Sequence, residues 1–372
     1  MNLNFAEVLA TLWPDAAFRV ASDARPPEEY LFAKFLPEIT KPSYHVEAGY
    51  MTVRPTMAGL TGMDSPYAKG GQITVSTFLE RSAKLTNSVV MREEAQRQLQ
   101  EFVRQIVIDG GSANGFLRDE ALAFLMDVVV QGHLDTMEYL RGQALSTGAL
   151  AWTYNNVSLA VDYGVPAGNK LTTRTVASTN NYGGAVSKFW EDVRAAQRLL
   201  RYRVAAAIAH PDTIDEIVEN AANNLHVINQ GTNGEWIEVQ RYVGNTEQNS
   251  GDTRDKLRIY SYGHEGEVLD PANPGSTVKV EFIAPGKVVL VGQAGRSGYR
   301  VGQGSQVDLQ DELAVGYTHI GPTVEGGGRP GRWANMYTPQ QRAYELVAEG
   351  VTNGLPVIEN PDKIVILTTE LA

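Results

Sequence analysis

Only a few groups of residues in this sequence have types and spacings that could do chemistry. One is the run Gly326-Gly-Gly-Arg-Pro-Gly331, which has the glycine spacing of a loop that holds phosphate on its backbone N–H groups. Such a loop also needs Lys and Ser or Thr directly after its last glycine, and Arg332 and Trp333 stand there instead. The run therefore predicts a flexible or subunit-bridging loop rather than a nucleotide site.

The residues that could bind a metal also lack the spacing of a known metal site. The six histidines are scattered, without the His-x-x-x-His pair of a zinc hydrolase. His264, Glu265 and Glu267 could bind a metal weakly, and the acidic cluster at 308–312 could serve acid–base catalysis or bind calcium. A solvated loop and a solvated edge are the better interpretations of these two groups, so we predict no metal and no cofactor.

A covalent nucleophile is also missing. The sequence has no cysteine, which removes disulfides, thiolate metal sites and cysteine nucleophiles together. No Gly-x-Ser-x-Gly turn accompanies the scattered histidines and acids. We therefore assign no catalytic residue and predict that the protein is not an enzyme.

The basic residues Arg194, Arg198, Arg201 and Arg203 lie on or just beyond one expected helix. They could contact DNA, but a solvated or subunit-facing surface is the simpler interpretation. The chain has 32 Lys and Arg against 43 Asp and Glu, a net charge of −11, which repels nucleic acid and anionic membranes at long range. A general DNA-binding protein is therefore not expected.

The composition is that of an ordinary folded protein. The 372 residues correspond to two or three domains of about 150 residues each. Hydrophobic residues make up 43% and charged residues 20%, which argues against a disordered or fibrous chain. Residues 1–17 lack the pattern of a signal peptide, and the longest apolar stretches, such as 121–130, are too short and interrupted to span a bilayer.

The first ninety residues predict an arm followed by a β ribbon. Residues 1–12 have the apolar spacing of a short helix, which Trp13-Pro14 and Pro26-Pro27 end. Residues 44–90 are rich in β-branched residues and predict two long strands joined by a polar loop. Because these strands lack a dense hydrophobic face, the ribbon cannot bury much surface within its own chain, and we expect it to need a partner.

The remaining sequence predicts a helical part and then an α/β part. Apolar spacing predicts an amphipathic helix over 92–107 and a longer one over 117–145 that Gly148 closes. Residues 150–161 predict a β-hairpin turning at 155–156, and residues 171–184 a linker. The expected α/β elements that follow are helices over 186–202 and 210–222 and strands over 204–208, 236–243, 257–262, 278–283, 288–292 and 363–369.

Short motifs complete this pattern in order along nearly the whole chain. In the first half they are Gly70-Gly71 before a polar strand to Arg81, residues 141–148 at the end of the long helix, and residues 162–164 after the hairpin. In the second half they are residues 205–208 before a Pro-Asp helix, residues 287–292, and the closing residues 360–372. Together they resemble tailed-phage major capsid proteins with the Hong Kong 97-like fold. Within that group the sequence is most similar to the family of the phage lambda major head protein.

The resemblance implies an α+β capsid fold with five parts. These are an N-terminal arm (1–36), an extended β loop reaching over a neighbour (37–91), a peripheral domain with a spine helix and a β-hairpin (92–186), an axial α/β domain (187–351) and a strand returning to the peripheral domain (352–372).

The resemblance also implies a function and partners. The protein would be a structural major capsid protein that self-assembles into the icosahedral shell around the double-stranded DNA of a tailed bacteriophage, without binding that DNA specifically. Its partners would be further copies in hexamers and pentamers, a separate scaffold protein, a portal and, in some shells, a decoration protein, but no membrane. It would assemble in the host cytoplasm and reside in the virion. The expected subunit-interface residues are Gly70, Gly71, Glu80, Arg81, Arg329 and Arg332.

Two alternatives remain open from the residues alone. One is a non-viral encapsulating shell protein, and the other is an enzyme with an unrecognised site in the 187–351 α/β domain. Electron microscopy or size exclusion separates them, because an enzyme gives a small closed oligomer and a shell protein gives rings or particles.

The first forty residues also bear on the scaffold. Prolines at 14, 26, 27 and 37 exclude the sustained heptads of a fused helical scaffold. We therefore expect a shell that is built without cutting this chain and with a scaffold supplied separately.

Overall fold

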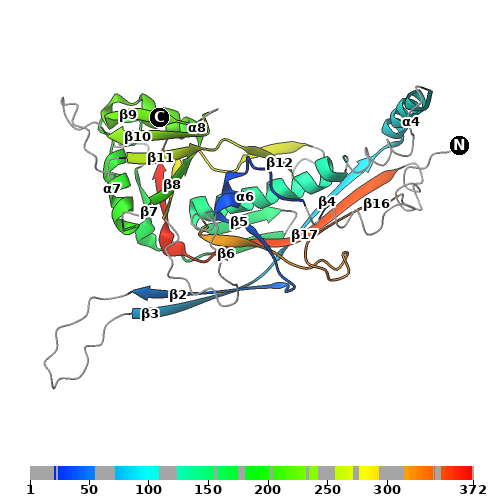
Figure 1. The fold of residues 1–372 in the computed structure, drawn as a ribbon, viewed down its shortest axis with the longest axis horizontal. Coiled ribbons are helices and arrows are strands. Elements are labelled where there is room, and N and C mark those ends of the chain that lie inside the picture. Colours follow the sequence, from blue (N-terminus) through cyan, green and yellow to red (C-terminus); the bar gives the residue numbers. More distant parts are fainter. Residues whose placement is uncertain are drawn as a thin grey trace, which may run out of the picture.

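The computed structural model describes residues 21, 24–54, 72–108, 123, 125–154, 157–174, 181–201, 204–231, 234–241, 256–270, 276–292, 314–337, 339 and 345–370. These residues form an elongated body that holds two sheets along its length, with a two-stranded ribbon beneath it and a helix at one end (Figure 1). In this part of the chain no helix is long and apolar enough to cross a membrane.

A helical rod at the centre of the body contacts strands of both sheets. A π-helical turn, η1 (Leu125–Val130), leads into α6 (Gln131–Thr147), which spans about 25 Å at 1.5 Å per residue. Gly148, with a φ of 70°, ends α6, and its N–H bonds to the carbonyl of Ala144. The expected helix over 117–145 is thus confirmed from 125 onward, and its earlier residues lie outside the described part apart from 123.

One sheet has five strands and lies on one side of α6. Its longest strand, β17, pairs along one edge with β15 and β16 and along its other edge with β4, while β1 extends the sheet beside β15. A short helix, α3, precedes β1 and packs on α6. The bounds are α3 (Leu31–Phe35), β1 (Glu38–Thr40), β4 (Ala83–Met91), β15 (Gly316–Ile320), β16 (Arg332–Tyr337) and β17 (Leu346–Ile358).

The other sheet has seven strands in the order β7-β18-β14-β8-β11-β10-β9. Alternate residues of its central strands point to opposite faces, so Leu290 packs beneath α7 and α8 while Val289 joins the core shared with α6. The bounds are β7 (Lys170–Arg174), α7 (Phe189–Leu199), β8 (Val204–Ala209), α8 (Pro211–Glu219), β9 (Leu225–Gln230), β10 (Trp236–Arg241), β11 (Lys256–Ser261), β14 (Lys287–Gly292) and β18 (Ile364–Thr369).

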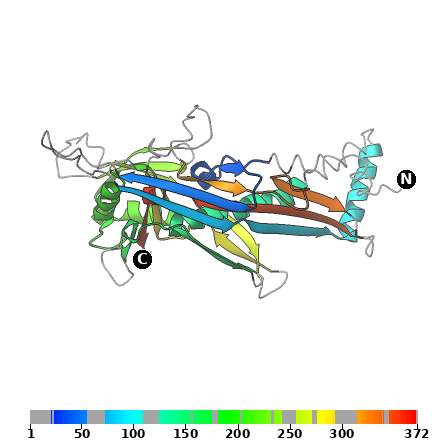
Figure 2. The same cartoon turned by 90° about the horizontal axis from the view of Figure 1, so that it is seen from below.

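Three hairpins and one helix project from this body. The hairpin β5 (Ala149–Tyr154) and β6 (Val157–Asp162) follows α6 as expected. A second hairpin, β12 (Glu265–Leu269) and β13 (Thr277–Glu281), and the ribbon β2 (His45–Arg54) and β3 (Gln72–Arg81) each form a separate two-stranded sheet. The expected amphipathic helix is α4 (Glu93–Ile108), at the far end of the five-stranded sheet (Figure 2).

Two expected elements differ from the structure. Residues 84–90 were expected to continue the ribbon, but β4 pairs with β17 from Ala83↔Gly354 to Met91↔Leu346. The ribbon therefore ends near Ser82. The expected returning strand over 352–372 is two strands in two sheets, because β17 ends at Ile358 and β18 enters the seven-stranded sheet. Pairing between strands more than 250 residues apart leaves no local signal in the sequence.

Candidate assembly surfaces

The ribbon is the most extended surface of the protein. Its two strands pair without a register shift from His45↔Arg81 to Arg54↔Gln72, ten residue pairs that extend over about 33 Å. Among the described strands, β2 and β3 pair only with each other. A two-stranded sheet alone is marginally stable in water, so this geometry favours a partner surface from outside the subunit.

The base of the ribbon is fixed to the body. Val46 is fully buried in the main core, and the N–H of Ser82 donates to the carbonyl of Tyr44 at 3.2 Å. On the body side, Nε2 of His319 lies 2.9 Å from the carbonyl oxygen of Ser43. Lys41 donates to the hydroxyl of Tyr317 at 2.9 Å. The direction in which the ribbon leaves the body is therefore set by contacts within the subunit.

The expected interface residues of the ribbon lie partly at this base. Arg81 is exposed opposite His45, and Glu80 is half-buried opposite Val46. Burial, with a contribution from the charge of Glu80, raises the pKa of Tyr163 above its ordinary value. The range 70–71, which holds two further expected interface glycines, lies outside the described residues. The interface role of all four residues stays a prediction.

The glycine-rich run 326–331, which the sequence predicts to be a flexible or subunit-bridging loop, forms a turn closed by backbone hydrogen bonds within the subunit. The N–H of Gly328 donates to the carbonyl of Thr323 at 2.9 Å, and the N–H of Gly327 donates to that of Val324 at 3.0 Å. Gly327 and Gly328 have φ values of 70° and 79°, which explains why glycine occupies both positions. Lys84 also bonds Glu325 at 2.6 Å, so this turn is tied to the start of β4.

Arg329 and Arg332 were expected to meet acidic groups of a neighbouring subunit, and the structure separates them. Arg329 is exposed on the turn. Arg332 is 2% exposed and bonds the carboxylate of Glu38 and the carbonyl of Ala24, both in its own chain. The internal carboxylate that pairs with Arg332 was missed because it lies 294 residues away in sequence.

Arg332 belongs to a buried ionic cluster of four side chains: Glu38, Glu138, Arg141 and Arg332. Arg141 is fully buried and donates to Glu38 at 2.7 Å, to Glu138 at 3.0 Å and to the hydroxyl of Thr318 at 2.8 Å. The cluster therefore joins β1, α6, β15 and β16.

The second carboxylate of this cluster also holds the arm. Glu138 accepts hydrogen bonds from the N–H of Phe32 at 2.7 Å and from the hydroxyl of Tyr262 at 2.9 Å. Burial raises the pKa of Glu138 above its ordinary value, against the opposing effect of Arg141. Burial acts in the same direction on Glu38, but Arg332 and Arg141 outweigh it and hold that pKa below its ordinary value. These contacts fix residues 24–40 against the rod.

The ionic cluster was not anticipated from the sequence, although a signal existed. Glu138 and Arg141 are spaced i, i+3 on the expected long helix and lie among Met137, Leu140 and Ala144, which form its buried side. Charged residues inside an apolar stripe are rarely buried unless they are paired. They marked a buried polar contact but not its distant partners.

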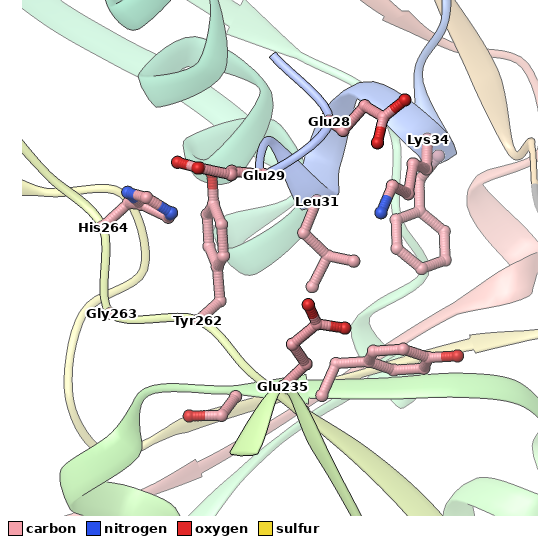
Figure 3. A pocket seen from close by; sticks show the side chains of 11 residues that line it. Glu28, Glu29, Leu31, Lys34, Glu235, Tyr262, Gly263 and His264 are labelled. Carbon is pink, nitrogen blue, oxygen red and sulfur yellow. The ribbon is translucent and has the colours of Figure 1, made fainter. Parts of the chain in front are cut away.

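A groove of about 450 Å³ lies between the arm and the seven-stranded sheet (Figure 3). Glu28, Glu29 and Lys34 reach it from the arm side and Glu235 from the sheet side, with Leu31 between them. Within the described residues no group of three or more His, Asp or Glu side chains could hold a metal ion. Carboxylates at an open groove suit a contact surface better than a reaction centre.

The weak metal candidate of the sequence is not assembled. Glu265 pairs with Lys279 across the β12–β13 hairpin at 2.8 Å, and Glu267 accepts a hydrogen bond from Thr277. Both glutamates are thus engaged in cross-strand contacts. The acidic cluster at 308–312 lies outside the described residues.

Comparison with known proteins shows the family of this chain. The family model described as phage major capsid protein E matches residues 89–300, more than half of the chain. The chain belongs to this family. As a phage major capsid protein it has a structural role, and the family and fold are those of structural proteins. No curated protein sequence matches it.

Three solved structures are similar to this capsid protein at low sequence identity, and the first of them shares its fold. A protein described as the capsid protein of an E. coli CFT073 prophage is 12% identical, with a TM-score of 0.54, and the match covers 95% of this chain and 97% of that one. The mature capsid of bacteriophage PhiM1 is 11% identical, with a TM-score of 0.42 and coverage of 94% and 90%. The SrpI encapsulin of Synechococcus elongatus PCC 7942 is 11% identical, with a TM-score of 0.42 and coverage of 96% and 95%. The expected α+β Hong Kong 97-like fold is confirmed.

Proposed function

We propose that this capsid protein forms rings of six and five copies that close into an icosahedral shell around the double-stranded DNA of a tailed phage. The observation that carries the proposal is the ribbon, whose ten residue pairs extend from an anchored base without any other described strand beside them. In a shell, each ribbon lies over a neighbouring subunit, which supplies the contact that the ribbon lacks. Many copies of a modest interface then stabilise a closed assembly.

The five-part division that the resemblance implies is retained as part of the proposal, with boundaries changed to follow the two sheets. The extended loop ends near Ser82, and β1, β4, β15 and β16 are assigned to the peripheral domain with α6 and β17. The axial domain contains the seven-stranded sheet with α7 and α8, and β7 and β18 are assigned to it.

The partners follow from the same role. A separate scaffold protein directs shell size, a portal occupies one vertex, and a decoration protein covers the outside in some shells. The net charge of −11 supports enclosure of DNA without specific binding, because a shell that bound DNA tightly would hinder packing and ejection. The protein assembles in the host cytoplasm, resides in the virion and catalyses no reaction.

The test replaces residues 50–76, which include five of the ten residue pairs, with Asn-Gly, the preferred two-residue turn between paired strands, directly after the Gly49↔Thr77 pair. Circular dichroism reports folding, and size exclusion with negative-stain electron microscopy reports rings and shells. We expect the shortened chain to fold as the full chain does but to form no closed shells.

The matched control shortens another hairpin in the same way, by replacing residues 271–275 between β12 and β13 with Asn-Gly. This variant is expected to assemble. Normal shells from the ribbon variant would contradict the role of the ribbon, and a full chain that forms no rings or shells would contradict the proposed function as a whole.

A further inference from the structure

The pairing of the ribbon strands divides their residues between two faces. Residues two apart along a strand share a face with the residues that they pair with, because successive side chains of a strand point to opposite sides. One face, the inner face, contains the pair Val46↔Glu80, and the outer face contains the pair His45↔Arg81. Val46 is fully buried in the main core, whereas His45 and Arg81 are exposed. At the base of the ribbon the inner face is therefore turned toward the subunit and the outer face away from it.

The apolar residues change faces along the ribbon. Next to the base, the inner face combines Val46 with Ala48 and Phe78, and the outer face is mostly polar. In the last four residue pairs of the ribbon this order is reversed. The outer face of these pairs holds four apolar residues, here called the outer apolar patch: Met51, Val53, Ile73 and Val75. The inner face of the same pairs holds four polar residues: Thr52, Arg54, Gln72 and Thr74.

Strand pairing alone does not require this separation. Val and Thr are both favourable in strands, so pairing would tolerate either residue on either face. Regular alternation of apolar and polar residues is typical of strands with one face packed on a partner and the other in water. Among the described strands, β2 and β3 pair only with each other, and Figure 1 shows them as a separate layer beneath the body. The last four pairs therefore have the pattern of a half-buried sheet whose apolar face requires a partner.

A second copy of the chain fits this patch as the partner. The protein belongs to a family of phage major capsid proteins, and a capsid brings many copies of one chain into contact. The chain's own core lies on the inner side of the ribbon at its base, so the outer face is the side left for a neighbour. The outer apolar patch contains no charged residue, so it suits an apolar surface rather than DNA or a charged segment.

We propose that the outer apolar patch packs against an apolar surface of a neighbouring copy, while the polar inner face of the same four pairs stays in water. This inference rests on the proposed ring-forming function and adds which face of the ribbon makes the contact and the chemistry of that contact. The ribbon thereby uses its two faces for two subunits. Its inner face packs on its own core through Val46 at the base, and its outer face packs on the next copy through the last four pairs.

The test places one glutamate on either face of the ribbon in the full chain. Val53→Glu and Val75→Glu charge the outer apolar patch. Their matched controls, Thr52→Glu and Thr74→Glu, charge the inner face at the neighbouring residues of the same strands. Native mass spectrometry or sedimentation velocity measures the fraction of chains in rings, and electron microscopy counts shells. We expect each outer-face variant to lower the ring fraction about tenfold or more, because it would bury an unpaired charge. The two controls and Val75→Ile, which keeps the patch apolar, are expected to assemble, and circular dichroism checks that every variant folds.

A second measurement locates the contact in the assembled shell. The sequence contains no cysteine, so Val53→Cys and Thr52→Cys each introduce a single thiol on one face of the ribbon. The rate of maleimide labelling is compared between free subunits and shells formed from the purified chain. We expect assembly to slow the labelling of Val53→Cys about tenfold or more, since a buried thiol is unreactive, and to leave that of Thr52→Cys nearly unchanged.

The outcomes separate the two proposals. If the wild-type protein forms shells and both outer-face glutamate variants form them equally well, the outer-face contact is wrong and the proposed function stands. Protection of the thiol in Thr52→Cys rather than in Val53→Cys would overturn the inference, because the other face would then make the contact. Labelling of Val53→Cys that slows only after a second phage protein is added would assign the patch to that protein instead. If the wild-type protein forms no rings or shells, the proposed function fails, and this contact fails with it.

Discussion

Two helical contacts of this protein differ in the side chains that form them. One is the contact of α7 and α8 with the seven-stranded sheet, and the other is the contact of α6 with the arm and the five-stranded sheet. Beneath α7 and α8 the contact consists mainly of apolar side chains such as Val193, Ile217 and Leu290. Beside α6 the apolar core is interrupted by four charged side chains, of which Glu38 is 16% exposed and the other three are almost completely removed from water. An apolar contact tolerates sliding and repacking, whereas paired charges fit in one arrangement only.

The difference corresponds to the roles that the proposed shell gives to the two regions. The seven-stranded sheet is continuous. In the proposed shell, the base of the ribbon has to leave the body in a fixed direction, so that each copy would reach its neighbour in the same way. The ionic cluster fixes residues 24–40 to α6, and the arm can be displaced only by separating buried charges.

The largest effect is expected when the ionic cluster loses its central cation. Arg141→Ala leaves Glu38 and Glu138 with fewer partners, which is expected to lower the free energy of unfolding by about 3–5 kcal/mol. Urea unfolding followed by tryptophan fluorescence measures the change. Adding Glu138→Gln, which keeps the acceptor for Phe32 and removes one unpaired charge, is expected to restore part of the loss. An Arg141→Ala variant as stable as the wild type would show that the cluster does not hold the arm.

A smaller effect is expected from pH, because the cluster has a buried histidine beside it. Burial and the charge of Arg332 lower the pKa of His133 from 6.5 to about 4. A histidine with a lowered pKa stabilises the fold while it is neutral, above 6.5, and this stabilisation is lost as the pH falls toward 4. Between pH 7 and pH 5 the loss amounts to about 2 kcal/mol.

The measurement compares urea unfolding at pH 7 and pH 5 for the wild type, for His133→Leu and for His226→Leu, which replaces an exposed histidine as a control. The His133 variant should lose much of the pH dependence, and the control should keep it. Glu38, with its lowered pKa, contributes stability that is lost only below its ordinary value of 4.5, outside this window. An unchanged pH dependence in His133→Leu would contradict the assignment.

The apolar contact should respond weakly to a swap that keeps its volume. Leu290 is fully buried beneath α7 and α8, and Leu290→Met is expected to cost less than about 1.5 kcal/mol. Arg141→Lys keeps the positive charge in the cluster but loses the branched guanidinium group that reaches Glu38 and Glu138 together. It is therefore expected to lower the free energy of unfolding by more than Leu290→Met does. Equal losses in thermal unfolding experiments would remove the distinction between the two contacts.

The same contrast explains what the sequence could and could not predict. Apolar periodicity predicted α7 and the strand β14 within a few residues and the rod from residue 125 onward, because each buries a regular apolar stripe. It did not predict that β4 joins β17, or that β18 lies in the other sheet, because these choices depend on distant strands. The resemblance to phage capsid proteins supplied the fold, whereas the partner of Arg332 became apparent only in the structure.

The smallest effect is expected for the exposed ion pair between Lys84 and Glu325. This pair allows the strength of an ion pair in contact with water to be compared with that of the ion pairs in the buried cluster. The pair is 2.6 Å long, but 53% of the Lys84 side chain is exposed. The hydrogen bond from Lys84 lowers the pKa of Glu325, which indicates an attraction that water screens. A double-mutant cycle with Lys84→Ala and Glu325→Ala is therefore expected to give a coupling of about 0.2–1 kcal/mol in low salt, and less as salt rises. A coupling as large as that between Arg141 and Glu138 would show that exposure to water does not weaken this ion pair, and would contradict the contrast with the buried cluster.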